Sequence, residues 1–319
     1  MSKISDIAKT VGVSTATVSR AFNQHPYVNE ALRKKILEVG QKMNYAPTIS
    51  SLRRNFGIVF GNFKFGYYQR HLLYHLTNGI LAKGYNLQIV NSNQLPFIHK
   101  NTYCGMFLLS NFSRMEELQK LGIPLMFVNY ALDGFYSVTT DHKLSMEIAV
   151  SHLIKHGHRK IAFVRAKKGH WGSDLREKGY RETLSKYNIA FDPKLLAFYY
   201  KPDDIEKRLL KLVSAKATAV VVDGEENTPA VNYFLNKNHI RVPDDLSVIC
   251  FEDEEHSQYT NPPYTAVKQD FGALGMVAAS IMLQLISQKK NLQIATNTVI
   301  PGNSLVIRES VRTISDISS

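Results

Sequence analysis

The chain has 319 residues, of which 44% are hydrophobic and 21% charged, values that are ordinary for a folded globular protein and exclude a disordered or fibrous one. It has no apolar run of the ~20 residues that a bilayer span needs, and its first residues, MSKISDIAKT, lack the apolar segment of a secretory signal. The formal net charge is +12, and residues 1–56 hold nine Lys and Arg against three acidic residues. We therefore expect a cytoplasmic protein that does not bind membranes. The clustered positive charge favours nucleic acid as a partner, although a basic terminus that only aids solubility would have the same composition.

The first 46 residues predict three short helices. Gly12 would end the first, Ser14 would cap the second and Asn29 would cap the third, which ends before Pro47. Apolar side chains recur at helical spacing and would form a small core: Ile4, Ile7, Ala8, Val11, Val18, Ala21, Phe22, Leu32, Ile36, Val39 and Met43. A four-residue turn between the first two helices is typical of a helix-turn-helix.

The second of these helices carries the candidate base-reading residues. In a helix-turn-helix, the exposed side chains at the start of this helix meet base edges in the major groove. Thr15 and Ala16 offer a hydroxyl and a methyl contact, and Arg20, one turn later, can bind guanine through two hydrogen bonds. Thr17 and Ser19 suit phosphate oxygens. The alternative is a capped surface helix of ordinary small residues.

From Gly57 onward, short apolar runs alternate with helical patterns. The predicted strands are 57–63, 85–92, 104–110, 124–130, 160–166, 218–224 and 246–252, and the predicted helices are 68–84, 142–157, 176–188, 202–215 and 228–239. This alternation predicts parallel sheets covered by helices on both faces, and the number of strands favours two sheets.

The sequence resembles the LacI/GalR family of bacterial transcription regulators. The resemblance rests on ISDIAKTVGVSTATVSRAFN and VNEALRKKILEVGQKMNYAP, followed by GHRKIAFV, RVPDDLSVICFED and SQYTNPPYTAVKQDFGALG in the family's order. It implies an all-α helix-turn-helix headpiece and an α/β sensor domain of two lobes, like a periplasmic binding protein, with parallel sheets. It also implies a homodimer that binds a pseudopalindromic double-stranded DNA operator, most often as a repressor. A small-molecule effector, a sugar or a related metabolite, would bind between the lobes, and no cofactor is expected.

The resemblance also predicts where the domains begin and end. We expect a DNA-binding domain at 1–46, a hinge or linker at 47–56, an effector-binding and dimerisation domain at 57–312 and a tail at 313–319. Lobe 1 would consist of about 57–158 and 270–299, and lobe 2 of about 159–268 and 302–312.

For DNA contacts, the resemblance assigns Thr15, Ala16 and Arg20 to bases. It places four residues near the DNA backbone: Thr17, Ser19, Asn23 and Tyr27. In the hinge, Leu52 would wedge into a minor-groove step beside Arg53 and Arg54 on phosphates. This linker is shorter than the family pattern, so a plain basic linker without a wedge remains the alternative.

For the effector, the resemblance assigns Arg176 in REKGY and an acidic residue at the end of ICFED, either Glu252 or Asp253. A surface salt bridge is the alternative role for Arg176. Trp171, which we expect on a loop after the strand 160–166, is a candidate platform for a ring or else packs between the lobes.

Two departures from the family pattern concern the sensor domain. Residues 223–225 read Asp-Gly-Glu where the family commonly has Asn-Asp, and residues 91–105 leave little room for a helix. Both permit a regulator whose sensor has lost its effector.

Other chemistry finds little support in the sequence. His152, His156 and His158 raise the possibility of a metal, but no HExxH motif is present and no cysteine is near, so we expect no metal site. No P-loop, nucleophile elbow or dinucleotide fingerprint is present, and we expect no enzyme. Cys104 and Cys250 lie in apolar runs, and we expect no disulfide. A sugar-binding transport component would share the two-lobed fold but would need an export signal.

Overall fold

The computed structural model describes residues 4–22, 27–43, 55–60, 66–98, 102–109, 115–200, 204–253, 255–287 and 296–314. The described residues near the N-terminus form three helices, α1 (Ile4–Val11), α2 (Thr15–Phe22) and α3 (Glu30–Lys42). They pack around one small core whose buried members are Ile7, Ala8, Val18, Ala21, Val28 and Ile36. The predicted helix-turn-helix headpiece is confirmed.

Local signals end and begin these helices as the sequence predicts. Gly12 ends α1 with a φ of +78°, a left-handed conformation that glycine adopts without steric cost. Its amide donates to the Ala8 carbonyl at 3.0 Å. Ser14 Oγ caps α2 by accepting from the Thr17 amide at 3.1 Å, and the Asn29 side chain caps α3 in the same way at 2.8 Å.

Lobe 1 is built on a six-stranded sheet in the order β11-β5-β4-β3-β1-β2, and all of its strand pairs are parallel. Its strands are β1 (Asn55–Phe60), β2 (Asn86–Asn91), β3 (Gly105–Leu108), β4 (Leu125–Val128), β5 (Tyr136–Thr140) and β11 (Asn297–Ile300). On one face, α4 (Tyr67–Leu81) and α11 (Phe271–Ile286) cover a core that includes Phe56 and Ile58. On the other face, Val59 packs with Leu118 of α5 (Met115–Lys120). A 3-10 helix, η2 (Ser92–Phe97), stands before β3, where the sequence leaves little room for an α-helix.

Lobe 2 is built on a second sheet in the order β12-β10-β9-β8-β6-β7. Its strands are β6 (Ile161–Ala166), β7 (Leu196–Tyr199), β8 (Ala219–Val222), β9 (Ser247–Phe251), β10 (Thr265–Lys268) and β12 (Ser304–Val306). The pairs are parallel except that β12 runs antiparallel to β10. Its helices are α6 (His142–Lys155), α7 (Trp171–Lys186), α8 (Ile205–Ser214), α9 (Thr228–Lys237) and α10 (Glu255–Gln258), with short 3-10 turns η3 (Pro193–Leu195) and η5 (Glu225–Asn227). Alternate residues of β6 face opposite cores, Phe163 toward α6 and α7 and Val164 toward α8 and α9.

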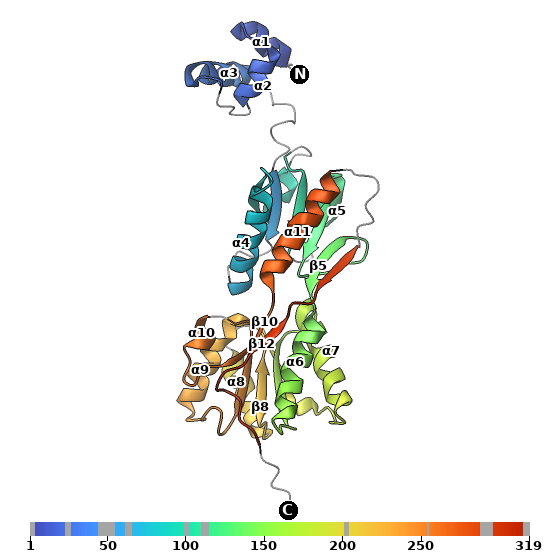
Figure 1. Cartoon of the computed structure of the whole chain (residues 1–319), viewed down its shortest axis with the longest axis vertical. Coiled ribbons are helices and arrows are strands. Elements are labelled where there is room, and N and C mark those ends of the chain that lie inside the picture. The colour runs from blue at the N-terminus through green and yellow to red at the C-terminus, as the bar shows by residue number, and fades with distance from the viewer. Residues whose placement is uncertain are drawn as a thin grey trace, which may run out of the picture.

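The chain passes between the lobes three times, after β5, after β10 and after β11 (Figure 1). The crossings are bonded to one another. The Thr140 hydroxyl donates to the Gln269 side-chain oxygen, and Asn303 Nδ2 donates to the Asp141 carbonyl and to Ser145 Oγ, each at 2.7 Å. Because each crossing is hydrogen-bonded to another, the three crossings form a single hinge between the lobes.

Three predicted boundaries differ from the structure. The first crossing lies near 141 and not at 158, because α6 packs against β6 and α7 in the core of lobe 2 through Met146 and Leu153. β1 begins at Asn55, inside the linker predicted at 47–56. The first residues of the tail predicted at 313–319 belong to the folded domain, because the Ile314 amide donates a hydrogen bond to the His156 carbonyl at 2.8 Å.

Candidate functional site

The exposed face of α2 is the first candidate site. Val18 and Ala21 are fully buried against α1 and α3, which turns Thr15, Ala16 and Arg20 toward solvent. Ala16 and Arg20 are four residues apart and lie on the same side of the helix. The helix therefore presents a hydroxyl, a methyl and a guanidinium group on one open surface.

The residues predicted to lie near the DNA backbone differ in their exposure to solvent. Thr17 and Ser19 are half-buried, and Thr17 Oγ1 lies 2.9 Å from Ser14 Oγ, so Thr17 also takes part in the cap of α2. Tyr27 is 88% exposed just before α3. Asn23, Leu52 and Arg53 lie outside the described residues, and their predicted roles stay predictions.

The second candidate site is a cavity of about 450 Å³ between the two lobes, within the roughly 300–1,000 Å³ of typical small-molecule sites. Lobe 1 and the crossings contribute Tyr68, Gln69, Leu109, Asn129, Tyr130, Gln269 and Phe271. Lobe 2 contributes His142, Gly169, His170, Trp171, Gly172, Ser173, Arg176, Tyr199, Asp223, Gly224, Glu226 and Glu252. Most of the polar groups lie at the carboxyl ends of lobe 2 strands, where parallel sheets bind ligands.

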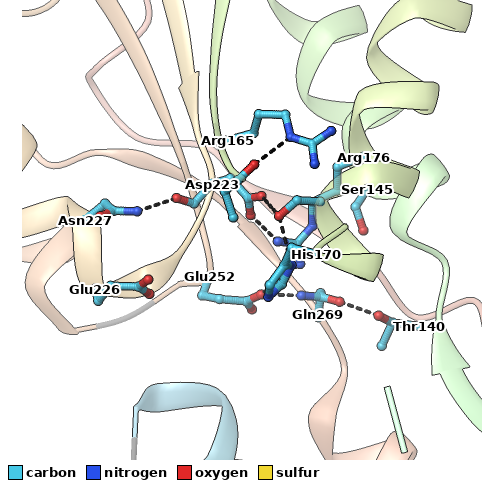
Figure 2. Close-up of polar contacts among 12 residues, drawn as sticks. Thr140, Ser145, Arg165, His170, Arg176, Asp223, Glu226, Asn227, Glu252 and Gln269 are labelled. Carbon is cyan, nitrogen blue, oxygen red and sulfur yellow. Dashed lines mark hydrogen bonds and ion pairs between the residues drawn. The ribbon is translucent and has the colours of Figure 1, made fainter. Parts of the chain in front are cut away.

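Arg176 is the centre of the polar cluster (Figure 2). It projects from α7, and its guanidinium forms an ion pair with Asp223 through Nη1 and lies 3.7 Å from Glu252 Oε1 through Nη2. The guanidinium also lies over the Phe251 ring, 4.2 Å from its centroid. Burial alone would lower the pKa of Arg176, but Asp223 and Glu252 outweigh it and raise that pKa above its ordinary value. Arg176 is therefore a buried, permanently charged group between two carboxylates.

The spacing of the REKGY motif follows from helix packing. A Cβ atom at Gly179 would lie 2.6 Å from the Lys143 carbonyl oxygen of α6, so only glycine permits this approach of α7 to α6. The same motif places Arg176 about one turn earlier, at the cavity end of α7. The same motif therefore sets the packing of α7 against α6 and places the Arg176 side chain at the cavity.

Asp223 is a site residue that was not predicted from the sequence. It was noted only because residues 223–225 depart from the family pattern. It follows β8, where its amide donates to the Val164 carbonyl at 2.8 Å, and its carboxylate accepts from Arg176 and from the Ser173 hydroxyl. Asn227 Nδ2 donates to the Asp223 carbonyl at 2.6 Å. The backbone and both sides of the carboxylate are thereby held in one position.

Of the two acidic candidates after β9, the structure brings only Glu252 to the cavity. Glu252 is buried with a φ of +67°, and its carboxylate accepts from the Gln269 amide (Figure 2). The prediction for Asp253 is wrong in position, because Asp253 forms an ion pair with Arg308 at 2.5 Å and does not line the cavity. Both residues follow the end of β9, and the left-handed conformation of Glu252 turns its side chain, and not that of Asp253, toward the cavity.

Trp171 lines the cavity as predicted, but it begins α7 and does not lie on a loop. Its ring centroid is 5.4 Å from that of Tyr130 in lobe 1 and 5.3 Å from that of His142. Its position comes from the turn before α7, which Arg165 holds through the carbonyls of Ala166 and Lys167. The aromatic wall therefore spans both lobes.

His142 is the second residue that the sequence did not reveal. It is 3% exposed, and neither ring nitrogen has a hydrogen-bond partner among the described residues. Burial, assisted by the charge of Arg176 and by His170, lowers the pKa of His142 well below its ordinary value. A neutral imidazole whose two nitrogens are buried and lack a partner among the described residues thus lines the cavity.

The described parts of the chain contain no group of three or more His, Cys, Asp or Glu side chains arranged to hold a metal, and none of their helices combines the length and apolar character of a membrane span. Cys104 and Cys250 are both free thiols.

Comparison with known proteins gives two family matches. Residues 3–48 match the model for bacterial regulatory proteins of the lacI family, and residues 150–311 match the periplasmic binding protein-like domain. The probable HTH-type transcriptional repressor ExuR of Bacillus subtilis is 28% identical over 335 residues, which cover 98% of this chain and 99% of that protein.

Two solved structures share the fold. The transcriptional regulator CelR in complex with cellobiose has a TM-score of 0.73 at 21% identity and covers 97% of this chain and 100% of its own. The lac repressor dimer bound to operator and the anti-inducer ONPF has a TM-score of 0.73 at 20% identity and covers 98% of this chain and 99% of its own.

Proposed function

Because this chain belongs to the LacI family of bacterial regulatory proteins, we propose that α2 reads an operator while a small effector in the interlobe cavity controls the binding. The protein is a sequence-specific DNA-binding repressor of transcription. The observation that carries the control is the buried Arg176 cluster in a cavity to which both lobes contribute. We propose no catalytic step for the protein, and we expect it to act on DNA in a bacterial cytoplasm.

The proposed base-reading residues are Thr15, Ala16 and Arg20, because they form the open surface of α2. Arg20 would bind guanine in the major groove, and Ala16 and the Thr15 methyl suit a thymine methyl. Thr17, Ser19 and Tyr27 would lie along the DNA backbone, where side chains position a protein without reading sequence. Asn23, Leu52 and Arg53 keep the backbone and hinge roles that the family implies.

The cavity connects to the hinge through a chain of hydrogen bonds. Glu252 accepts from Gln269, Gln269 accepts from Thr140, and the Thr140 hydroxyl also lies 3.0 Å from the Asn129 side-chain oxygen in lobe 1. A ligand that bonds to Glu252 would act on two of the three crossings. Differential binding to the open and closed arrangements is what allows an effector to shift the lobes. The cavity itself favours a sensor that still binds an effector.

We also propose that two copies pair. Large apolar side chains are exposed on both lobes, Tyr74 and Ile89 on lobe 1 and Tyr233 and Tyr259 on lobe 2, at 64%, 46%, 63% and 84% exposure. The lac repressor, which shares the fold, is a dimer on its operator. Pairing would bury these side chains and place two headpieces on the halves of a pseudopalindrome.

Selection of binding sites from random DNA tests the proposed function. The full-length protein should enrich one pseudopalindromic site, and Arg20→Ala should weaken binding to it by about 1–3 kcal/mol and relax the preference at one base pair in each half-site. The matched control is Lys35→Ala, which removes one exposed charge from α3 and should weaken binding to all sequences equally. Recovery of random DNA by the wild-type protein would contradict the function, and an unchanged preference in the Arg20 variant would contradict the assignment of that residue.

A further inference from the structure

The charges around the cavity are unbalanced. Among the described lining residues, Arg176 is the one permanent cation, and Asp223, Glu226 and Glu252 are carboxylates. His142 and His170 add no charge near neutral pH, because burial lowers the pKa of each ring, and Asp223 offsets only part of this for His170. The cavity therefore has an excess of negative charge.

Two buried carboxylates already neutralise the positive charge of Arg176. Asp223 forms an ion pair with Nη1, Glu252 lies 3.7 Å from Nη2, and all three side chains are less than a tenth exposed. An anionic ligand that approached Arg176 would have to displace a buried carboxylate or lie beside it. Two like charges a few ångströms apart in a partly buried site repel strongly, so either arrangement is unfavourable.

The remaining polar groups suit hydroxyls. Asp223 and Glu252 accept hydrogen bonds, and the buried, neutral His142 lines the cavity with one donor and one acceptor that have no partner among the described residues. Arg176 Nε also has no partner among the described residues. Trp171 and Tyr130 supply aromatic walls from the two lobes, on which the apolar face of a ring can lie.

We propose that the effector is a polyhydroxylated ring without a negative charge, a neutral sugar or an amino sugar, and that the cavity discriminates against uronates and sugar phosphates. The inference rests on the proposed function, because it takes the interlobe cavity as the effector site. It adds the charge of the ligand, which the family alone leaves open.

The test compares sugars that differ only in charge. The full-length protein is titrated with the glucose, galactose and mannose series, each as neutral hexose, 2-amino-2-deoxyhexose, hexuronate and hexose 6-phosphate, and with cellobiose and maltose. Binding is followed by thermal stabilisation and by the fluorescence of Trp171, the single tryptophan of the chain. A neutral or amino sugar should bind at least about tenfold more tightly than the acidic members of its series. An acidic sugar that binds as tightly, or a failure of every sugar to bind, would overturn the proposal.

Variants test the cause of the discrimination. Asp223→Asn removes one of the two carboxylates that hold Arg176 and should shift the ratio of neutral to acidic affinity by about tenfold toward the acid. Glu226→Gln, at the more exposed rim, should shift it in the same direction by less. The control is Glu206→Gln, which removes a charge from the surface pair with Lys237 and should leave the ratio unchanged. An unchanged ratio in folded Asp223 and Glu226 variants would overturn the electrostatic explanation.

Operator binding in the same samples separates this inference from the proposed function. If neutral sugars bind but no duplex is preferred, the regulatory function fails and the charge rule stands. If a specific operator is bound and only an acidic sugar changes that binding, the function stands and the charge rule fails.

Discussion

Removal of the Arg176 guanidinium should destabilise the protein, because two buried carboxylates would lose their counter-charge. Arg176→Met keeps an apolar side chain over the Phe251 ring and removes the ion pairs with Asp223 and Glu252. Loss of one partner from a buried ion pair typically costs about 3–5 kcal/mol. For a domain of this size, roughly 2–4 °C per kcal/mol gives a fall in Tm of about 6–20 °C.

The loss should depend on pH in a definite direction. In the variant, two buried carboxylates would lie close together without a counter-charge, and such an arrangement favours the protonated form of a carboxyl group in the folded state. A carboxyl group with a raised folded-state pKa destabilises the folded state when it is ionised and costs nothing once it is protonated. The difference between variant and wild type should therefore be largest at pH 7 and should shrink as the pH falls toward 5.

Urea unfolding at pH 7 and at pH 5, followed by far-UV circular dichroism and Trp171 fluorescence, measures both effects. The triple variant R176M/D223N/E252Q is the matched control, since it removes the orphaned charges and should recover most of the stability. A single variant within about 1 kcal/mol of wild type at pH 7, or a loss independent of pH, would show that water already solvates these carboxylates.

Two further predictions concern the headpiece and lobe 2. Gly12→Ala should lower the free energy of unfolding of the headpiece by about 1–2 kcal/mol, because alanine is strained at a φ of +78°; unchanged melting of α1 to α3 by circular dichroism would contradict this. His158 is buried with its ring bonded to Thr218 Oγ1 and the Arg312 carbonyl, and burial lowers its pKa to about 4. Since the unfolded chain takes up this proton near pH 6.5 and the folded protein near 4, stability should fall by up to about 3 kcal/mol over that window as the pH drops. His158→Gln should reduce the slope but not abolish it, because His152 titrates in the same direction, and equal slopes in urea unfolding would refute the role of His158.

The parts of the fold that local chemistry determines could be predicted from the sequence. Gly12, Ser14 and Asn29 act within a few residues of themselves, and the apolar runs of β6 and β8 are buried on both faces. The strand β5 was not predicted because it carries polar residues that are buried only through tertiary partners. Ser137, for example, donates to the Asn297 side chain at 3.0 Å, 160 residues away.

The candidate site divides in the same way. Arg176 and Glu252 belong to motifs that the sequence displays, whereas Asp223 and His142 become site residues only because the lobes bring distant segments together. Asp223 and Ser173 are 50 residues apart and share one hydrogen bond. Which of Glu252 and Asp253 faces the cavity depends on one backbone angle at the end of β9, a φ of +67°, that composition does not reveal.

The late return of the chain to lobe 1 has a consequence for how the protein is made. α11 covers the face of the lobe 1 sheet that carries Phe56, Ile58 and Phe107, but it lies more than 200 residues downstream of β1. On the ribosome, almost all of lobe 2 emerges while this face is covered by α4 but still lacks α11. A message that terminates before residue 271 would therefore release a polypeptide whose lobe 1 sheet exposes the apolar surface that α11 normally covers, which makes it a substrate for chaperones and proteases.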